Sequence, residues 1–293
     1  MKHAPEWALT VLGCPRCARR LKADGSTVLR CKECGVFPVL GGAPILVPEP
    51  ARWCAAFYES ALAALTEVGL ADDLSLSTLR AFADGMRGEE PERFGDDWTR
   101  EELEGRAPPT LVDGVGSQAL NELVTLSEVQ SVREWLASRV TGDCVVEVGC
   151  GAGLLSEKLS SAKHLVVIDL SLRSVLQASQ RSGGYPVVGD AEVLPLQKAS
   201  VDSLVAENVI DLLEEPGAFF ERAKTSLKKR GQLLLCTPEP SLGDPQGDDS
   251  KMVELAATAG FKVLEVLDGA PWLRRHSTRY LEVYLVQALS LRP

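Results

Sequence analysis

The chain has 293 residues, of which 45% are hydrophobic and 25% are charged, a composition typical of a folded globular protein and not of a disordered or fibrous one. A formal net charge of −10 excludes the uniformly basic surface common among proteins that bind nucleic acids. No apolar run reaches the roughly 18 residues that a membrane-spanning helix needs. Since the first residues also lack the pattern of an export signal, we expect a cytoplasmic protein.

Charge is distributed unevenly and suggests three parts. The net charge is +3 over residues 1–50, −9 over residues 51–125 and −4 over residues 126–293. We therefore expect a small N-terminal module, an acidic helical linker or lid region, and a larger C-terminal domain. We also expect the module and the domain to have separate hydrophobic cores.

The N-terminal module carries two C-x-x-C pairs. Cys14, Cys17, Cys31 and Cys34 follow the pattern C-x2-C-x13-C-x2-C. In a chain without an export signal, such pairs favour metal binding over a disulfide or a reduced dithiol pair, which are the alternatives. Four thiolates suit tetrahedral zinc, and a site closed by four protein ligands is structural. The pattern therefore predicts one structural zinc ion.

The first half of the chain shows few long periodic segments. Residues 8–48 read as short strands and turns around the cysteine pairs. Apolar residues at helical spacing predict a helix over about 51–70. The acidic residues 71–115 are expected to be rich in loops, with short helices.

From about residue 120, strand and helix patterns alternate, which predicts an α/β fold with a mostly parallel sheet. The expected strands are 144–150, 164–170, 185–190, 201–208, 231–237, 261–267 and 280–289. The link 268–279 is too short for a right-handed crossover, so the last strand is expected to run antiparallel. The predicted architecture is a Rossmann-like, doubly wound sheet of seven strands.

A glycine-rich turn follows the first of these strands. Gly149, Gly151 and Gly153 lie where glycines let the backbone turn tightly and let a ligand approach the main chain. Asp169 ends the next strand, 20 residues after Gly149, and a carboxylate there can bind both hydroxyls of a ribose. A dinucleotide fingerprint would need glycine where Leu154 stands. The alternative is a tight turn that binds nothing.

Four segments, in order, resemble class I S-adenosylmethionine-dependent methyltransferases. VVEVGCGAG resembles the first motif of that family, and VVIDLS resembles the second. GDAEVLPLQKASVDSLVAENVIDLLEEP and LKKRGQLLLCTPE resemble two segments further along. The resemblance covers about residues 126–289. It implies S-adenosylmethionine as cofactor and a binding set of Glu147, Gly149, Cys150, Gly151, Gly153, Asp169, Leu170, Asp190, Ala191, Glu207 and Asn208.

The same resemblance implies individual roles. The glycines would lie against the methionine part of the cofactor, with Glu147 placing its amino group. Asp169 would hold the ribose, and Asp190 would bind the adenine together with the backbone N–H of Ala191. Glu207 and Asn208 would lie beside the reactive methyl. Burial as an ordinary packing residue is the alternative for Cys150.

The link 269–279 is expected to form a loop over the acceptor, because ligands bind outside the carboxyl ends of the strands in such sheets. Trp272 offers a flat apolar face, and Arg275 offers a fork for an anionic group. His276 is the candidate general base, with a solvent-exposed loop histidine as the alternative. No [DN]-P-P-[YF] motif follows the fourth strand, which disfavours the nucleic-acid amino-group methylases that use it.

The cysteine-containing segment resembles bacterial zinc-ribbon proteins related to the activator subunit of eukaryotic tRNA and protein methyltransferases. The leading interpretation is a methyltransferase that acts on a small molecule and binds neither membrane nor nucleic acid. The alternative is an rRNA or tRNA methyltransferase that holds RNA through the basic residues of the module. These are Arg16, Arg19, Arg20, Lys22, Arg30 and Lys32. A third interpretation, an inactive interaction module, is disfavoured by the intact glycine loop.

Overall fold

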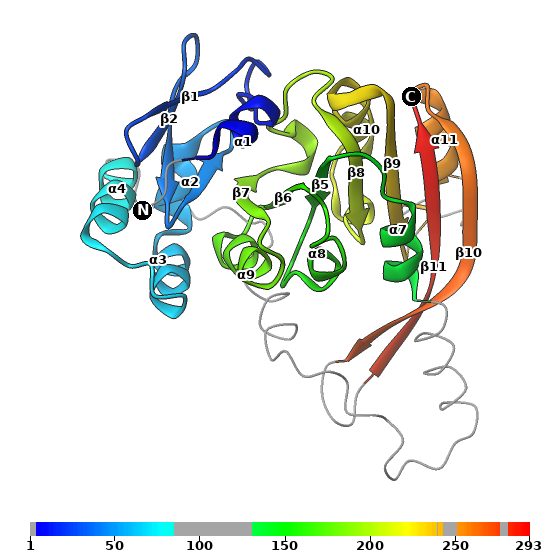
Figure 1. Cartoon of the computed structure of the whole chain (residues 1–293). Coiled ribbons are helices and arrows are strands. Elements are labelled where there is room, and N and C mark those ends of the chain that lie inside the picture. The colour runs from blue at the N-terminus through cyan, green and yellow to red at the C-terminus, as the bar shows by residue number, and fades with distance from the viewer. Residues whose placement is uncertain (1–3, 85–130, 239, 243–250, 276–280) are drawn as a thin grey trace.

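The computed structural model describes residues 4–84, 131–238, 240–242, 251–275 and 281–293 (Figure 1). Its strands form a mixed eleven-stranded sheet in the order β1-β2-β3-β4-β7-β6-β5-β8-β9-β11-β10. Helices cover both faces, which confirms the predicted α/β fold. The sheet is larger than the seven strands expected, because strands of the N-terminal region (residues 4–84) extend it.

The N-terminal region contains four strands and four helices among its described residues. They are α1 (Glu6–Val11), β1 (Lys22–Asp24), β2 (Val28–Cys31), β3 (Gly35–Leu40), β4 (Ala43–Leu46), α2 (Pro50–Ala56), α3 (Tyr58–Glu67) and α4 (Asp73–Ala83). The helix predicted over 51–70 is divided at Phe57 into α2 and α3. Helix α1 was not predicted, since its six residues are too few to show a clear period.

The C-terminal part alternates strands and helices as predicted. Its elements are α7 (Val132–Arg139), β5 (Cys144–Val148), α8 (Leu154–Lys158), β6 (His164–Asp169), α9 (Leu172–Ser182), β7 (Tyr185–Gly189), η1 (Ala191–Val193), β8 (Val201–Glu207), η2 (Ile210–Leu212), α10 (Pro216–Ser226), β9 (Leu227–Thr237), α11 (Lys251–Thr258), β10 (Lys262–Arg275) and β11 (Leu281–Arg292). Strands β7, β6, β5, β8 and β9 are parallel, whereas β11 runs antiparallel to β9 and β10. Among the described residues, no helix has the length and apolar character needed to cross a membrane.

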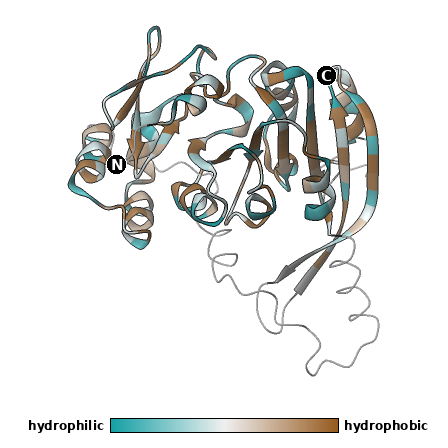
Figure 2. Cartoon of the chain, viewed as in Figure 1, coloured by the Kyte–Doolittle hydropathy of each residue, from teal (hydrophilic) through white to brown (hydrophobic). Residues whose placement is uncertain are grey.

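Two hydrophobic clusters lie on the two faces of the sheet. One includes side chains of α1, α10 and α11, and the other includes side chains of α2, α3, α4, α7, α8 and α9. All five residues of β5 are buried, as expected for a strand covered on both faces. Figure 2 shows hydrophobic residues concentrated along the central strands.

The N-terminal region does not have a core of its own. β4 pairs in parallel with β7, where Ile45 lies opposite Val188. Leu12 and Phe37 belong to the same hydrophobic cluster as strands β5, β6 and β8. The expectation of separate cores is therefore wrong. Pairing with β4 gives β7 a partner on its outer edge and buries apolar surface from both regions.

The β10–β11 hairpin corrects the predicted loop over 268–279 as far as Arg275, where the described part of β10 ends. Ala270 to Arg275 continue β10 and pair with Val286 to Leu281 of β11. Figure 1 shows this end of the hairpin projecting beyond the other strands. Gly269 has a φ of +69°, and the register shifts between Leu267 and Ala270. Gly269 therefore lies in a β-bulge inside one long strand.

Candidate active site and metal centre

The residues predicted to bind the cofactor lie where three adjacent parallel strands end. β6 pairs with β5 on one side and with β7 on the other. Glu147 is near the end of β5, Asp169 ends β6, and Asp190 directly follows β7. Because parallel strands end at one edge of a sheet, the fold brings these three carboxylates to a common edge.

The glycine loop between β5 and α8 has a backbone that requires glycine. Gly149, Gly151 and Gly153 have φ values of +70°, +47° and +84°. A Cβ on Gly149 would lie 2.1 Å from Cγ2 of Val209, and a Cβ on Gly153 would lie 2.5 Å from Cα of Ala178. The loop can therefore pack this closely against its neighbours only without side chains at these positions.

Asp169 joins the end of β6 to the glycine loop. Its Oδ2 accepts a hydrogen bond from the N–H of Gly151 at 3.0 Å, and its Oδ1 accepts one from Ser171 at 2.9 Å. Burial raises the pKa of this carboxyl, while these two N–H groups act in the opposite direction. Each carboxylate oxygen has a second lone pair, so the group can also accept hydrogen bonds from two ribose hydroxyls.

Glu147 is a buried acid next to the same loop. Its side chain accepts a hydrogen bond from the hydroxyl of Ser156, and the residue is 2% exposed. Burial raises its pKa to about 8, and the nearby Glu207 adds to the rise. A cation placed here would favour ionisation of Glu147, because an opposite charge stabilises the carboxylate.

At the end of β8, Glu207 connects three elements. Arg133 of α7 places its Nε 2.8 Å from the Glu207 carboxylate, and Trp272 of β10 donates from Nε1 to Oε1 at 2.9 Å. Trp272 is 8% exposed, so its ring packs within the protein. The contact of Arg133 with Glu207 was not predicted, because a single basic residue on a helix does not indicate which acidic residue it will pair with.

The remaining predicted cofactor residues lie near the same edge. Asn208 has a φ of +53° and donates its N–H to the carbonyl of Cys236. Asp190 accepts the N–H of Glu192 at 2.9 Å and caps η1, which begins at the largely buried Ala191. Cys150 is also buried, as its packing alternative requires.

A contact from the N-terminal region reaches the end of β6. Trp53 of α2 donates from Nε1 to the carbonyl of Leu170, directly after Asp169, at 3.2 Å. The sequence gives no sign of this contact between residues 117 positions apart. Of the acceptor-side predictions, His276 lies outside the described residues. Arg275 is placed through its backbone, opposite Leu281.

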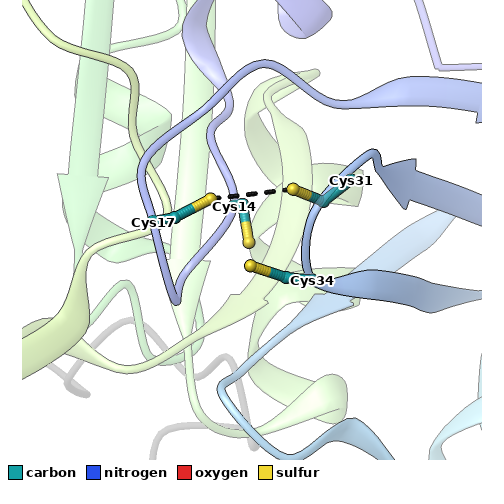
Figure 3. A group of neighbouring side chains, drawn as sticks. All are labelled: Cys14, Cys17, Cys31 and Cys34. Carbon is teal, nitrogen blue, oxygen red and sulfur yellow. Dashed lines mark hydrogen bonds between the residues drawn. The ribbon is translucent and has the colours of Figure 1, made fainter.

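The four cysteines of the N-terminal region converge on one point (Figure 3). Their sulfur atoms lie within 4.8 Å of one another, with 3.6 Å between Cys17 and Cys31. Tetrahedral zinc with Zn–S bonds of about 2.3 Å needs sulfurs about 3.8 Å apart. All eight cysteines of the chain are among the described residues, and none is in a disulfide. The donor set therefore fits a thiolate metal centre.

Backbone N–H groups shape the acidity of these thiols unequally. Burial raises the pKa of Cys14 to about 12. Burial also acts to raise the pKa of Cys31. The N–H groups of Glu33 and Cys34, together with hydrogen bonds to the side chains of Cys17 and Cys14, outweigh it and lower the pKa to about 7. Such N–H donors stabilise thiolates, the form that binds metals.

Comparison with known proteins identifies the C-terminal part. Residues 146–235 match the family model described as a methyltransferase domain. A probable S-adenosylmethionine-dependent methyltransferase from Mycolicibacterium smegmatis is 29% identical over 185 residues, which are 55% of this chain and 71% of that protein. A ubiquinone biosynthesis O-methyltransferase from Paraburkholderia xenovorans is 27% identical over 126 residues, 40% of this chain and 54% of that protein.

In seven curated relatives, the match spans between 36% and 54% of the relative's length. Among solved structures, a complex of the Haloferax volcanii Trm112 methyltransferase activator with a putative methyltransferase is similar, with 15% identity and a TM-score of 0.46. The match covers 69% of this chain and 100% of that chain. The family match over residues 146–235 and the sequence relatives support a class I S-adenosylmethionine-dependent methyltransferase domain in the C-terminal part of the chain.

Proposed function

We propose that the whole chain transfers a methyl group from S-adenosylmethionine to a small-molecule acceptor, and that Cys14, Cys17, Cys31 and Cys34 hold one structural zinc ion. The observation that carries the cofactor assignment is the position of Asp169. It ends β6, it is tied to the N–H of Gly151, and it retains acceptor capacity toward a ligand. That arrangement suits a ribose lying beside a glycine loop.

The cofactor, when bound, supplies an electrophilic methyl group on a sulfonium, so the protein has only to bind and orient the reactants. The residues proposed to hold it are Glu147, Gly149, Cys150, Gly151, Gly153, Asp169, Leu170, Asp190, Ala191, Glu207 and Asn208. Glu147 is proposed to pair with the cofactor's amino group. Its burial makes an isolated carboxylate costly there, and a bound cation would offset that cost.

The acceptor is proposed to lie between the end of β8 and the β10–β11 hairpin. The hydrogen bond from Trp272 to Glu207 fixes the ring of Trp272 at that place. Arg275 is proposed to bind an anionic group of the acceptor through its guanidinium. His276 is proposed to take up a proton from an oxygen nucleophile.

A small-molecule acceptor is favoured over RNA by the pairing of basic residues in the N-terminal region. Arg19 lies 3.0 Å from Glu33, and Arg30 lies 2.6 Å from Asp24. Arg16 donates to two carbonyls of its own region. The two carboxylate pairs reduce the positive field that a phosphate backbone requires, and the carbonyl contacts occupy donors of Arg16. The Paraburkholderia relative, whose name specifies a small-molecule pathway, supports the same proposal.

The three-part division of the chain is also a proposal about roles. Residues 126–293 would form the catalytic domain, 51–125 a linker or lid, and 1–50 the zinc-binding module. Because the described parts share their hydrophobic clusters, we do not propose that these parts fold separately. The cytoplasmic location stays a prediction.

The test is a transfer assay with methyl-labelled S-adenosylmethionine, run in parallel on a small-metabolite extract and on total cellular RNA. We expect label in the small-molecule fraction, and RNA binding near the non-specific range of about 10⁻⁴ M or weaker at physiological salt. Asp169→Ala serves as the cofactor-binding control. Label in RNA, together with submicromolar RNA binding that falls steeply with salt, would favour the RNA methyltransferase instead.

A further inference from the structure

The metal centre and the segment after β7 are joined by direct main-chain contacts. Gly13, next to Cys14, donates its N–H to the carbonyl of Pro195 at 2.8 Å. Leu12 and Leu196 form an antiparallel bridge. A Cβ on Gly13 would lie 2.9 Å from the carbonyl carbon of Leu196, so the two backbones are in contact with no room for a side chain.

Gln197 strengthens this junction from the other side. Its side-chain amide donates to the carbonyls of Leu9 and Leu12 at 2.8 and 2.9 Å, and its backbone N–H donates to the carbonyl of Val11 at 2.8 Å. Leu9 and Val11 belong to the last turn of α1 and Leu12 directly follows it, where carbonyls have no partner within the helix. One residue therefore satisfies three acceptors at the helix end that leads into the first cysteine pair.

The segment that receives these contacts begins at Asp190. Asp190 accepts the N–H of Glu192, and Leu196 donates its N–H to Leu194 at 2.9 Å. The Glu192 carboxylate in turn accepts the backbone N–H groups of Glu214 and Glu215 at 2.7 and 2.9 Å. Residues 190–197 are thus a short segment fixed at both ends. One end carries the proposed adenine contacts and the other carries Gln197.

We propose that metal binding at the four cysteines and cofactor binding at Asp190 and Ala191 are thermodynamically coupled, with Gln197 as the positioning residue between them. This inference rests on the proposed function. Metal binding holds the loop that follows Gly13, and through Pro195, Leu196 and Gln197 it holds the segment that receives the adenine. Coupling between two ligands is reciprocal, so each raises the affinity for the other by the same factor.

The experiment measures zinc affinity in the full chain by competition with a chromophoric chelator, with and without saturating S-adenosylhomocysteine. We expect zinc to bind about tenfold more tightly when S-adenosylhomocysteine is present, within the usual range of coupling between sites. Calorimetry on zinc-loaded protein supplies the S-adenosylhomocysteine affinity. Neither readout depends on methyl transfer.

Gln197→Met tests the route of the coupling. Methionine has nearly the same shape but donates no hydrogen bond, so the tenfold effect should fall to about threefold or less. The matched control is Gln180→Met, at an exposed position on α9, which should keep the tenfold effect. If Gln197→Met does not fold, the wild-type ratio still decides the matter.

The outcomes separate the two claims. If zinc-loaded wild-type protein does not bind S-adenosylhomocysteine, the proposed function fails. If it does bind but leaves zinc affinity unchanged, the coupling is overturned and the proposed function stands. If Gln197→Met keeps the full wild-type ratio, the assignment of Gln197 is overturned.

Discussion

The strands on the β7 side of the candidate site and the β10–β11 hairpin on its other side contact the site in different ways. On the β7 side, the N-terminal region adds β4 to the sheet, donates a hydrogen bond from Trp53 to Leu170 at the end of β6, and accepts one from Gln197. On the β10–β11 side, the hairpin projects outward, with Leu285 64% exposed, and meets the site through the contact between Trp272 and Glu207. From this difference we predict that the N-terminal region supports cofactor binding, and that the hairpin acts mainly on the acceptor side.

Loss of the metal site should lower the stability of the protein more than any other change considered, and mainly on the β7 side. Cys14→Ser removes one of four thiolates, and structural zinc contributes roughly 10 kcal/mol to the folding of small zinc-binding domains. Because β4 and β7 share a core, we expect the free energy of unfolding to fall by at least about 3 kcal/mol. Hydrogen exchange should show loss of protection in β4 and β7 before the β10–β11 hairpin.

The control for that experiment is Cys54→Ser, a buried cysteine of α2 outside the metal centre. It should lower stability without changing zinc content. If Cys14→Ser lost protection equally in β4, β7 and the β10–β11 hairpin, the two sides would depend equally on the metal site.

Glu147, on the central strand β5, should make the stability of the protein depend on pH. Burial raises its pKa from an ordinary value of 4.5 to about 8. Between these pH values the folded state keeps a proton that the unfolded state has lost, so this residue lowers stability as pH rises. The free energy of unfolding of Glu147→Gln, taken relative to that of wild type, should therefore rise by roughly 2–4 kcal/mol between pH 5 and pH 8.5. Urea unfolding at the two pH values tests this, and parallel pH dependence in the two proteins would contradict it.

Substitution of Asp169 should affect cofactor binding without involving either the N-terminal region or the hairpin. Asp169→Asn removes the charge and one acceptor, so S-adenosylhomocysteine should bind about 1.5–3 kcal/mol more weakly in calorimetry. Asp143→Asn is the matched control, since this exposed residue pairs with Lys163 before the start of β5. An Asp169→Asn affinity equal to that of the control would mean that the ribose lies elsewhere.

Trp272 should have the smallest effect, confined to the hairpin side. Trp272→Phe keeps an aromatic ring but removes the N–H donor to Glu207, which costs about 1 kcal/mol of stability. Arg133 still pairs with Glu207, so S-adenosylhomocysteine affinity should change by less than about twofold, on the order of 0.4 kcal/mol. A tenfold loss would show that the hairpin also supports cofactor binding.

Features of the site that depend on short stretches of sequence could be predicted. The glycine loop, the carboxylate at the end of β6 and the two cysteine pairs each follow from residue types at fixed spacing. The structure joins Asp169 to the loop and brings the four cysteines together. Strand and helix alternation gave the α/β fold for the same reason.

Features that depend on contacts between distant residues could not be predicted. Trp53 and Leu170 are 117 positions apart, and Gln197 and Leu9 are 188 apart, so no local pattern connects them. The prediction of separate cores was wrong because charge and residue spacing do not show that β4 pairs with the edge of β7. The loop expected over 268–279 was wrong up to Arg275, because no local pattern shows that Ala270 to Arg275 stay paired with β11.

The central claim is that the edge formed by β5, β6 and β7 binds an S-adenosyl cofactor. Calorimetric titration of the zinc-loaded chain with S-adenosylhomocysteine, and separately with a nicotinamide dinucleotide, tests it most directly. The account predicts a micromolar dissociation constant for S-adenosylhomocysteine, about −7 to −8 kcal/mol, and far weaker binding of the dinucleotide. Tighter binding of the dinucleotide than of S-adenosylhomocysteine would contradict it.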